Sequence, residues 1–126
     1  NYFDSSENCF ISAFRKNKKG GDFEIKIEYM SSPDLEGKTV ILCDPMLASG
    51  SSMVLAMEAL LSKGKPKHIH VVVTIASSEG VQYFKENSPF RNCTLWLGAE
   101  DKGMTAQSYI VPGLGDAGDL AFGEKI

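Results

Sequence analysis

The pattern of apolar and polar positions changes character near Pro33. Before it, residues 23–29 alternate strictly between apolar and charged side chains, which is the period of a strand with one buried face. A second apolar run covers residues 9–15, and a polar stretch ending in two glycines separates the runs. This arrangement predicts an antiparallel β-hairpin over residues 9–29.

Beyond Pro33 the apolar runs no longer alternate. Three of them, residues 39–43, 68–76 and 93–97, are continuous and rich in β-branched side chains. Continuous runs of this kind are typical of strands buried on both faces of a parallel sheet. The first run is expected to stop at Asp44 and Pro45.

Helical spacing fills the two intervals between these runs. Apolar side chains from Met53 to Leu61 recur on one helical face, and Gly64 and Pro66 follow, so a helix is expected from about Ser49. A second helix is expected through Asn87, capped by the serine at 77 or 78, with the side chains at 81 and 84 facing inward. The order strand, helix, strand, helix, strand predicts an α/β fold with a parallel sheet.

Composition narrows the class of protein. The chain has 126 residues, 43% of them apolar, and a net charge of −3, which suits one globular domain and argues against holding nucleic acid by overall charge. The longest apolar runs fall short of the ~18 residues of a membrane span. Cys9, Cys43 and Cys93 form no CxxC pair, and Cys43 is expected to be buried. A reducing compartment, the cytoplasm, fits best.

The segment DPMLASGSS, residues 44–52, is the strongest candidate for chemistry. It leaves a predicted strand and enters a predicted helix, where small residues let backbone N–H groups surround a phosphate. It lacks the lysine and spacing of a Walker A loop. Asp44 would repel the phosphate but could accept hydrogen bonds from sugar hydroxyls, which suggests a sugar phosphate. An ordinary strand-to-helix turn has the same composition, so both interpretations stay open.

A second candidate is YIVPGLGDAGD, residues 109–119. Its glycines let the backbone approach a ligand, its N–H and C=O groups could pair with the edge of a planar base, and Ile110 could supply an apolar face. Asp116 could accept from a base N–H or hold a water on a cation. A tight surface loop is the alternative. His68 and His70 lie two apart on a strand, and we interpret them as structural rather than as metal ligands.

The segments DPMLASGSSMVLAMEALL, HIHVVVTIAS and YIVPGLGDAGDLAFG, taken in this order, resemble the uracil phosphoribosyltransferase family, a branch of the type I phosphoribosyltransferases. The resemblance runs from about Phe10 to Lys125. It implies a parallel sheet flanked by helices, preceded by the hairpin, in one domain over residues 1–126. It also implies that this domain is the C-terminal portion of the family's chain, without the upstream part that carries a further substrate-binding arginine.

The resemblance also assigns site residues. It implies that Asp44 and Asp116 are catalytic, and that uracil is held by Ile110, Gly115, Asp116 and Ala117. It implies that phosphoribosyl pyrophosphate is bound by Arg15, Asp44, Pro45, Met46, Leu47, Ala48, Ser49, Gly50, Ser51, Ser52 and Asp116. Mg²⁺ would arrive with the pyrophosphate, without protein metal ligands. The family pattern has threonine in place of Ser49 and glycine in place of Ser51, where a positive φ would matter.

The function implied is synthesis of UMP and pyrophosphate from uracil and phosphoribosyl pyrophosphate in pyrimidine salvage. The partners implied are these small molecules, a GTP effector and further copies of the chain in a homodimer or higher homo-oligomer, with no nucleic acid and no membrane. The alternative is a non-catalytic nucleotide-binding or regulatory relative, or a fragment, that uses the same fold.

Overall fold

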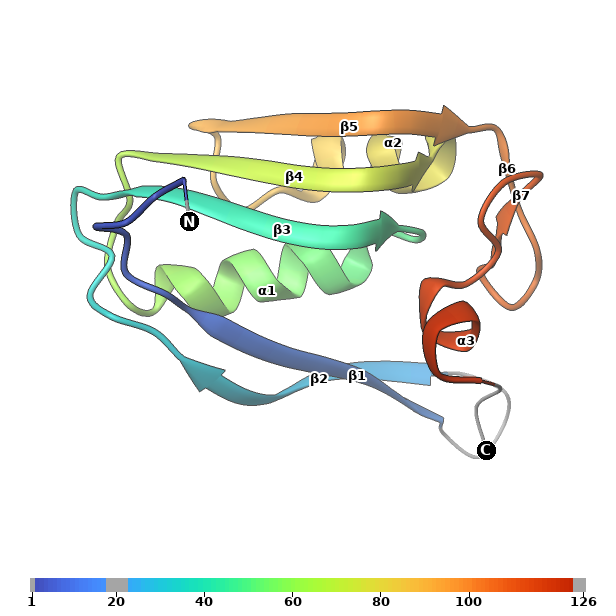
Figure 1. Cartoon of the computed structure of the whole chain (residues 1–126), viewed down its shortest axis with the longest axis horizontal. Helices are drawn as coiled ribbons and strands as arrows, with labels where there is room; N and C mark the ends of the chain where they lie inside the picture. The colour runs from blue at the N-terminus through green and yellow to red at the C-terminus, as the bar shows by residue number, and fades with distance from the viewer. Residues whose placement is uncertain (1, 18–22, 124–126) are drawn as a thin grey trace.

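The computed structural model describes residues 2–17 and 23–123, without the side chains of residues 14–17 and 23–25. Strands β1 (Phe10–Asn17) and β2 (Phe23–Ser31) pair antiparallel, with a register shift between Ser12 and Ala13. The predicted hairpin is thereby confirmed, and its loop lies outside the described residues. Both strands contact helix α1, on the side of that helix away from the main sheet (Figure 1).

The main sheet has three parallel strands in the order β3 (Thr39–Leu47), β4 (His68–Ser77) and β5 (Cys93–Asp101). Helices α1 (Ser51–Leu61) and α2 (Ser78–Asn87) make the two crossovers, which confirms the predicted order of elements. Because the strand order proceeds in one direction, two right-handed crossovers place both helices on the same face of the sheet. In the described part of the chain, no helix is long and apolar enough to cross a bilayer.

The core lies between that face and the two helices. Met57 is fully buried on α1, and Val81 and Phe84 of α2 are 6% and 3% exposed, as the spacing predicted. They pack on alternate side chains of the sheet, and the buried cluster comprises Leu47, Met53, Val54, Met57, Ile69, Val71, Val73, Ala76, Val81 and Phe84. Burial of these side chains is the main source of stability of the α/β unit.

The opposite face of the sheet is exposed. Register places Cys43, Val72 and Trp96 in one row across the three strands, and Val72 and Trp96 are 38% and 55% exposed. Ile41, on the same face, is 48% exposed. The expectation of a buried Cys43 and of strands covered on both faces is therefore wrong. Sequence runs do not report the order of the strands in the sheet, and here that order places both helices on the other face.

Strand β3 is also longer than predicted. It continues through Asp44 and Pro45 to Leu47, and Pro45 is missing from its register with β4. Among the described strands β3 pairs only with β4. Proline lacks an N–H and is tolerated on such an edge strand, so β3 continues past Pro45.

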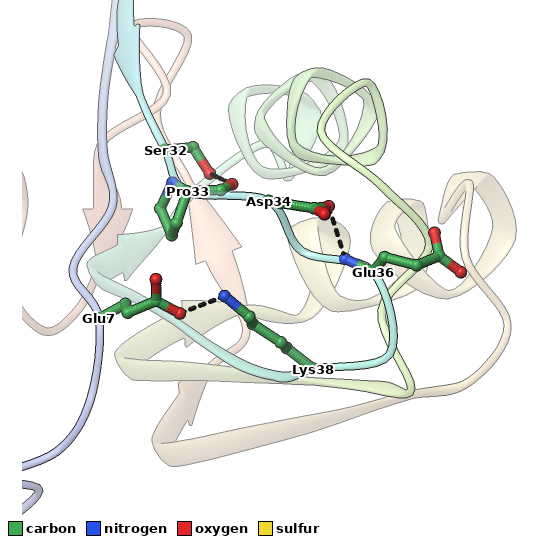
Figure 2. Close-up of polar contacts among 6 residues, drawn as sticks. All are labelled: Glu7, Ser32, Pro33, Asp34, Glu36 and Lys38. Carbon is green, nitrogen blue, oxygen red and sulfur yellow. Dashed lines mark hydrogen bonds and ion pairs between the residues drawn. The ribbon is translucent and has the colours of Figure 1, made fainter.

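Polar contacts hold the amino end of the sheet together (Figure 2). Glu7 and Lys38 form an ion pair between the N-terminal segment and the start of β3, and the Glu36 N–H donates to Asp34 Oδ1 over 3.0 Å. Backbone bonds of 2.8 and 2.9 Å join residues 35 and 37 to residues 63 and 65, which precede β4. The Glu7–Lys38 side chains are exposed, so the backbone bonds contribute more than the ion pair.

The last part of the chain lies at the carboxyl ends of the sheet strands (Figure 1). It forms strands β6 (Gly103–Met104) and β7 (Ile110–Val111), which pair antiparallel, and helix α3 (Ala117–Phe122). The sequence predicted a glycine-rich segment here, either base-binding or a tight surface loop, and no strand or helix, because elements this short leave no hydrophobic period to detect. Strand β7 contacts β4, and β6 contacts α2.

Candidate functional site

The turn from β3 into α1 presents an uncapped helix end. Gly50 is the N-cap of α1 and has φ +80°, a left-handed conformation that glycine adopts without strain. Within the described residues no side chain caps this helix, and its first turn holds no acidic residue. The free N–H groups and the positive end of the helix dipole favour an anion at this position.

Three serines surround that helix end. The hydroxyls of Ser49 and Ser51 lie 2.8 Å apart and hydrogen-bond to each other, and Ser52 is half-buried in the first turn. Ser51 stands where the family pattern has glycine, but it begins the helix. Of the residues that the structure describes, Ser108 is the only non-glycine with positive φ. Ser51 therefore carries no left-handed strain, and the glycine requirement falls on Gly50.

Asp44 lies on β3, three residues before the end of that strand. The Met46 N–H donates to its Oδ1 over 2.9 Å, which fixes the orientation of the carboxylate. Partial burial raises the pKa of Asp44, and the hydrogen bond from Met46 acts in the opposite direction. A carboxylate held in this way, near but not in the helix end, can accept hydrogen bonds from the hydroxyls of a sugar.

The turn rests directly on the start of α2. Ser77 Oγ donates to the Ala48 carbonyl over 2.6 Å and accepts from the Gly80 N–H over 2.8 Å. A Cβ on Gly80 would lie 2.1 Å from the Ala48 oxygen, and one on Gly50 would lie 2.7 Å from the Gly80 oxygen. The sequence predicted a helix cap at residue 77 or 78, and the cap is Ser77, but nothing local in the sequence points to Ala48.

The C-terminal segment closes on itself through its backbone. Ile110 and Gly115 exchange two backbone hydrogen bonds of 2.9 and 2.8 Å, and Gly115 has φ +73°. Asp116 is the N-cap of α3, where its Oδ1 accepts from the Asp119 N–H over 2.8 Å. Ile110 is fully buried, so its side chain supports the loop, and the half-buried Asp116 and Ala117 lie nearer to the surface.

The structure brings most of the predicted site residues to one edge. Residues 44–52 end β3 and begin α1, residues 110 and 115–117 lie in the C-terminal segment, and both stretches are at the carboxyl ends of the parallel strands (Figure 1). Arg15 lies on β1 and pairs with Ile25 of β2, and its side chain is not among those that the structure describes. The ends of β1 and β2 next to the hairpin loop lie on the same side of the molecule as this edge. The individual roles of these residues stay predictions.

The two histidines belong to the exposed face of the sheet. The ring nitrogens of His68 lie 2.9 and 2.8 Å from Asn92 Oδ1 and Thr94 Oγ1, and the Trp96 indole donates to His70 Nδ1 over 3.1 Å. Their rings are 4.5 Å apart. These contacts agree with a structural interpretation. Across residues 2–17 and 23–123, no three His, Cys, Asp or Glu side chains come together as metal ligands.

A parallel sheet with an uncapped helix end and a glycine-bearing turn at its carboxyl edge defines an α/β domain suited to an anionic ligand. The sequence model of the uracil phosphoribosyltransferase family matches residues 11–124. The chain belongs to that family.

Individual proteins and one solved structure are similar to this chain over almost all of its length. The uracil phosphoribosyltransferase of Porphyromonas gingivalis (strain ATCC 33277) is 56% identical over 126 residues, which is 100% of this chain and 58% of that protein. The one from Thermococcus sibiricus is 38% identical over 98% of this chain and 52% of its own length. The AQ2163 protein from Aquifex aeolicus superposes with a TM-score of 0.78 at 32% identity, over 94% of this chain and 54% of that chain. The chain thus spans little more than half the length of these relatives.

Proposed function

We propose that the protein makes UMP and pyrophosphate from uracil and 5-phosphoribosyl 1-pyrophosphate. The observation that carries this proposal is the uncapped α1 helix end behind Gly50, in a chain 56% identical to a uracil phosphoribosyltransferase. The 5′-phosphate binds at that helix end, where N–H groups and serine hydroxyls donate to it. Asp44 then accepts from the ribose hydroxyls.

The base binds along the C-terminal segment. The resemblance of YIVPGLGDAGD to the family's uracil signature, and the position of this segment at the carboxyl edge, support this part of the proposal. Asp116 and Ala117 present backbone groups to the edge of uracil, and Gly115, whose own N–H and C=O are bonded to Ile110, supplies the left-handed turn that places them. Ile110, fully buried and bonded to Gly115, holds the loop from behind.

The reaction requires positioning more than covalent catalysis. Uracil N1 forms a bond to ribose C1 as the bond from C1 to the pyrophosphate oxygen breaks, and the uracil N1 proton is released. Fixed placement of the two reactants and neutralisation of the leaving charge lower the barrier. Arg15 is the candidate to neutralise pyrophosphate, as its planar guanidinium suits phosphate oxygens.

For Mg²⁺, the proposed site offers the carboxylate of Asp116 as a contact. Mg²⁺ usually keeps several waters and binds through substrate phosphates, so it would be held here mainly by pyrophosphate and water, with Asp116 as the candidate protein contact. Asp116 already uses Oδ1 to cap α3, so its contact with the cation is better made through water. When bound, Mg²⁺ neutralises charge on the leaving pyrophosphate.

The test combines turnover with binding. The chain is incubated with labelled uracil, phosphoribosyl pyrophosphate and Mg²⁺, and UMP formation is followed chromatographically, while equilibrium dialysis with labelled UMP measures binding. Formation of UMP is the expected result. Asp116→Asn is expected to abolish turnover while leaving the circular dichroism spectrum unchanged. Absence of both turnover and UMP binding would overturn the proposal.

A non-catalytic nucleotide-binding or regulatory relative is the second candidate. The uncapped α1 helix end supports it, because that feature accounts for binding of a phosphate and requires no group transfer. UMP binding without turnover in the experiment above selects this candidate.

The remaining parts of the proposal concern setting and regulation. Cys9 and Cys43 are exposed and none of the three cysteines is in a disulfide, which suits the cytoplasm. We propose a homo-oligomer that responds to GTP, as the family resemblance implies. Sedimentation velocity with and without GTP, together with turnover at both conditions, tests these points.

A further inference from the structure

We propose that Ser77 is a positioning residue for the ligand-binding turn, which it holds through the carbonyl of Ala48. The proposal rests on the proposed function for the identity of the ligand, a ribose phosphate. It concerns a residue on β4, outside the segments that the family resemblance assigned to substrate.

The contact is buried and bidirectional. Ser77 is 1% exposed, and its hydroxyl donates to Ala48 O over 2.6 Å while it accepts from the Gly80 N–H over 2.8 Å. Ala48 itself is 6% exposed. One hydroxyl thus satisfies two backbone groups that water cannot reach, one on the turn and one on α2.

Capping of α2 alone does not account for this geometry. An N-cap needs only an acceptor for the helix N–H groups, which an aspartate or asparagine side chain also supplies. The donation to Ala48 requires a hydroxyl or another donor at this position. The close approach of Gly80 to the Ala48 oxygen, where a Cβ would lie only 2.1 Å away, brings the two backbones within reach of that short side chain.

The carbonyl that Ser77 holds lies two residues before Gly50. Gly50 turns the chain at φ +80° and begins the helix whose N–H groups face the anion. The Gly50 carbonyl accepts from the Val54 N–H over 3.1 Å. The turn is therefore held at Ala48 on one side and at Gly50 on the other, which leaves it little freedom. Ser77 therefore keeps the anion site formed before the ligand arrives.

The experiment compares Ser77→Ala with Ser77→Thr and with the control Ser88→Ala. Ser88 is the C-cap of the same helix, and its hydroxyl donates to Phe90 O over 3.2 Å, at the end away from the turn. Two quantities are measured: native-state amide exchange at residues 49–52, and the KM values for phosphoribosyl pyrophosphate and uracil. Binding of ribose 5-phosphate, followed by NMR shifts, replaces KM if the wild-type chain shows no turnover.

Ser77→Ala is expected to raise KM for phosphoribosyl pyrophosphate, or Kd for ribose 5-phosphate, about tenfold, the loss expected for one buried hydrogen bond. KM for uracil and kcat should stay within about twofold, because the 5′-phosphate is bound equally in ground and transition states. Exchange at residues 49–52 should rise about tenfold, more than at the centre of β4. Ser77→Thr, which keeps the hydroxyl, should restore both values, and Ser88→Ala should change neither.

Three results would overturn the proposal. The first is equal amide exchange at residues 49–52 in Ser77→Ala and Ser88→Ala. The second is a uniform rise in amide exchange over α2, β4 and the turn. The third is an equal change in the KM values for phosphoribosyl pyrophosphate and uracil. If Ser77→Ala does not fold, Ser77→Cys, with a weaker donor of similar size, is expected to show an intermediate effect. A wild-type chain that neither turns over nor binds ribose 5-phosphate refutes the proposed function, while the exchange measurement still decides the role of Ser77.

Discussion

Substitution of Gly80 by alanine tests how closely α2 rests on the turn between β3 and α1. The new Cβ would lie 2.1 Å from the Ala48 oxygen and 2.9 Å from the Leu47 oxygen, both of them backbone atoms that no rotamer change can move. Carbon and oxygen ordinarily stay about 3.3 Å apart or more. The two segments must therefore separate by about 1 Å, which takes the 2.6 Å bond from Ser77 to Ala48 beyond useful geometry.

The magnitude follows from three contributions. Overpacking in a tight site costs about 1–3 kcal/mol. Loss of a buried hydrogen bond that leaves a carbonyl unpaired costs about 1–3 kcal/mol. Alanine is favoured over glycine in a helix by about 1 kcal/mol, and Gly80 has no positive φ that would oppose it. The free energy of unfolding is thus expected to fall by about 3 kcal/mol, or roughly 10 °C in Tm.

The assay is thermal and urea unfolding followed by circular dichroism, with Gly118→Ala as the matched control. Gly118 is also helical, and a Cβ there meets only the Asp116 side chain, at 3.2 Å. The control should melt within about 3 °C of the wild type, because its new methyl group displaces no backbone. A Gly80→Ala protein as stable as Gly118→Ala would refute the close backbone contact between the turn and α2.

Three further predictions concern the carboxylate of Asp44, the core position Met57, and Trp96 on the exposed face of the sheet. Because burial raises the pKa of Asp44, the folded protein binds that proton more tightly than the unfolded chain, so its carboxylate lowers stability at neutral pH. This cost decreases as the pH falls through the raised pKa and is gone only below the ordinary pKa of 3.8. Asp44→Asn should therefore raise Tm at pH 7, with a smaller gain in acid and loss of turnover; an unchanged Tm at pH 7 would contradict the cause given for the shift. Met57→Ala, at a fully buried position, should lower the free energy of unfolding by about 2–5 kcal/mol in urea titrations, and a loss below about 1 kcal/mol would show that the site is not packed as described. Trp96, the only tryptophan and 55% exposed, should be strongly quenched by acrylamide in the native protein, whereas protection would mean that the face is covered in solution.

Local sequence signals located the elements that have a clear period or cap. The hairpin, the three parallel strands and both crossover helices agree with the structure, and the cap at Ser77 was one of the two serines expected. These features depend on neighbouring residues alone, which is why the sequence reports them. The turn between β3 and α1, within residues 44–52, was located for the same reason, since small residues between a strand and a helix form a local pattern.

Features that depend on distant residues were missed. Cys43 has the same apolar neighbours as a buried thiol, but it is exposed because the strand order places both crossover helices on the opposite face of the sheet. Pro45 looked like the end of a strand because proline lacks the N–H that a paired strand uses. That N–H is needed only on the side of a strand that pairs, and β3 pairs on one side, with β4. The contact between Ser77 and Ala48 joins residues 29 positions apart, so no local pattern contains it.

The position of β3 in the sheet has a consequence for the energetics of ligand binding. This strand leads into the turn proposed to bind the phosphate, yet among the described strands it has a neighbour on one side only, whereas β4 has two. Opening of the sheet should therefore begin at an edge strand, β3 or β5, rather than at β4, and a ligand at the carboxyl end of β3 would be bound only while that strand is in place. At 100 times its Kd, such a ligand adds about 2.7 kcal/mol against that opening. Substrate and strand thus stabilise one another, and the site should become more ordered as it fills.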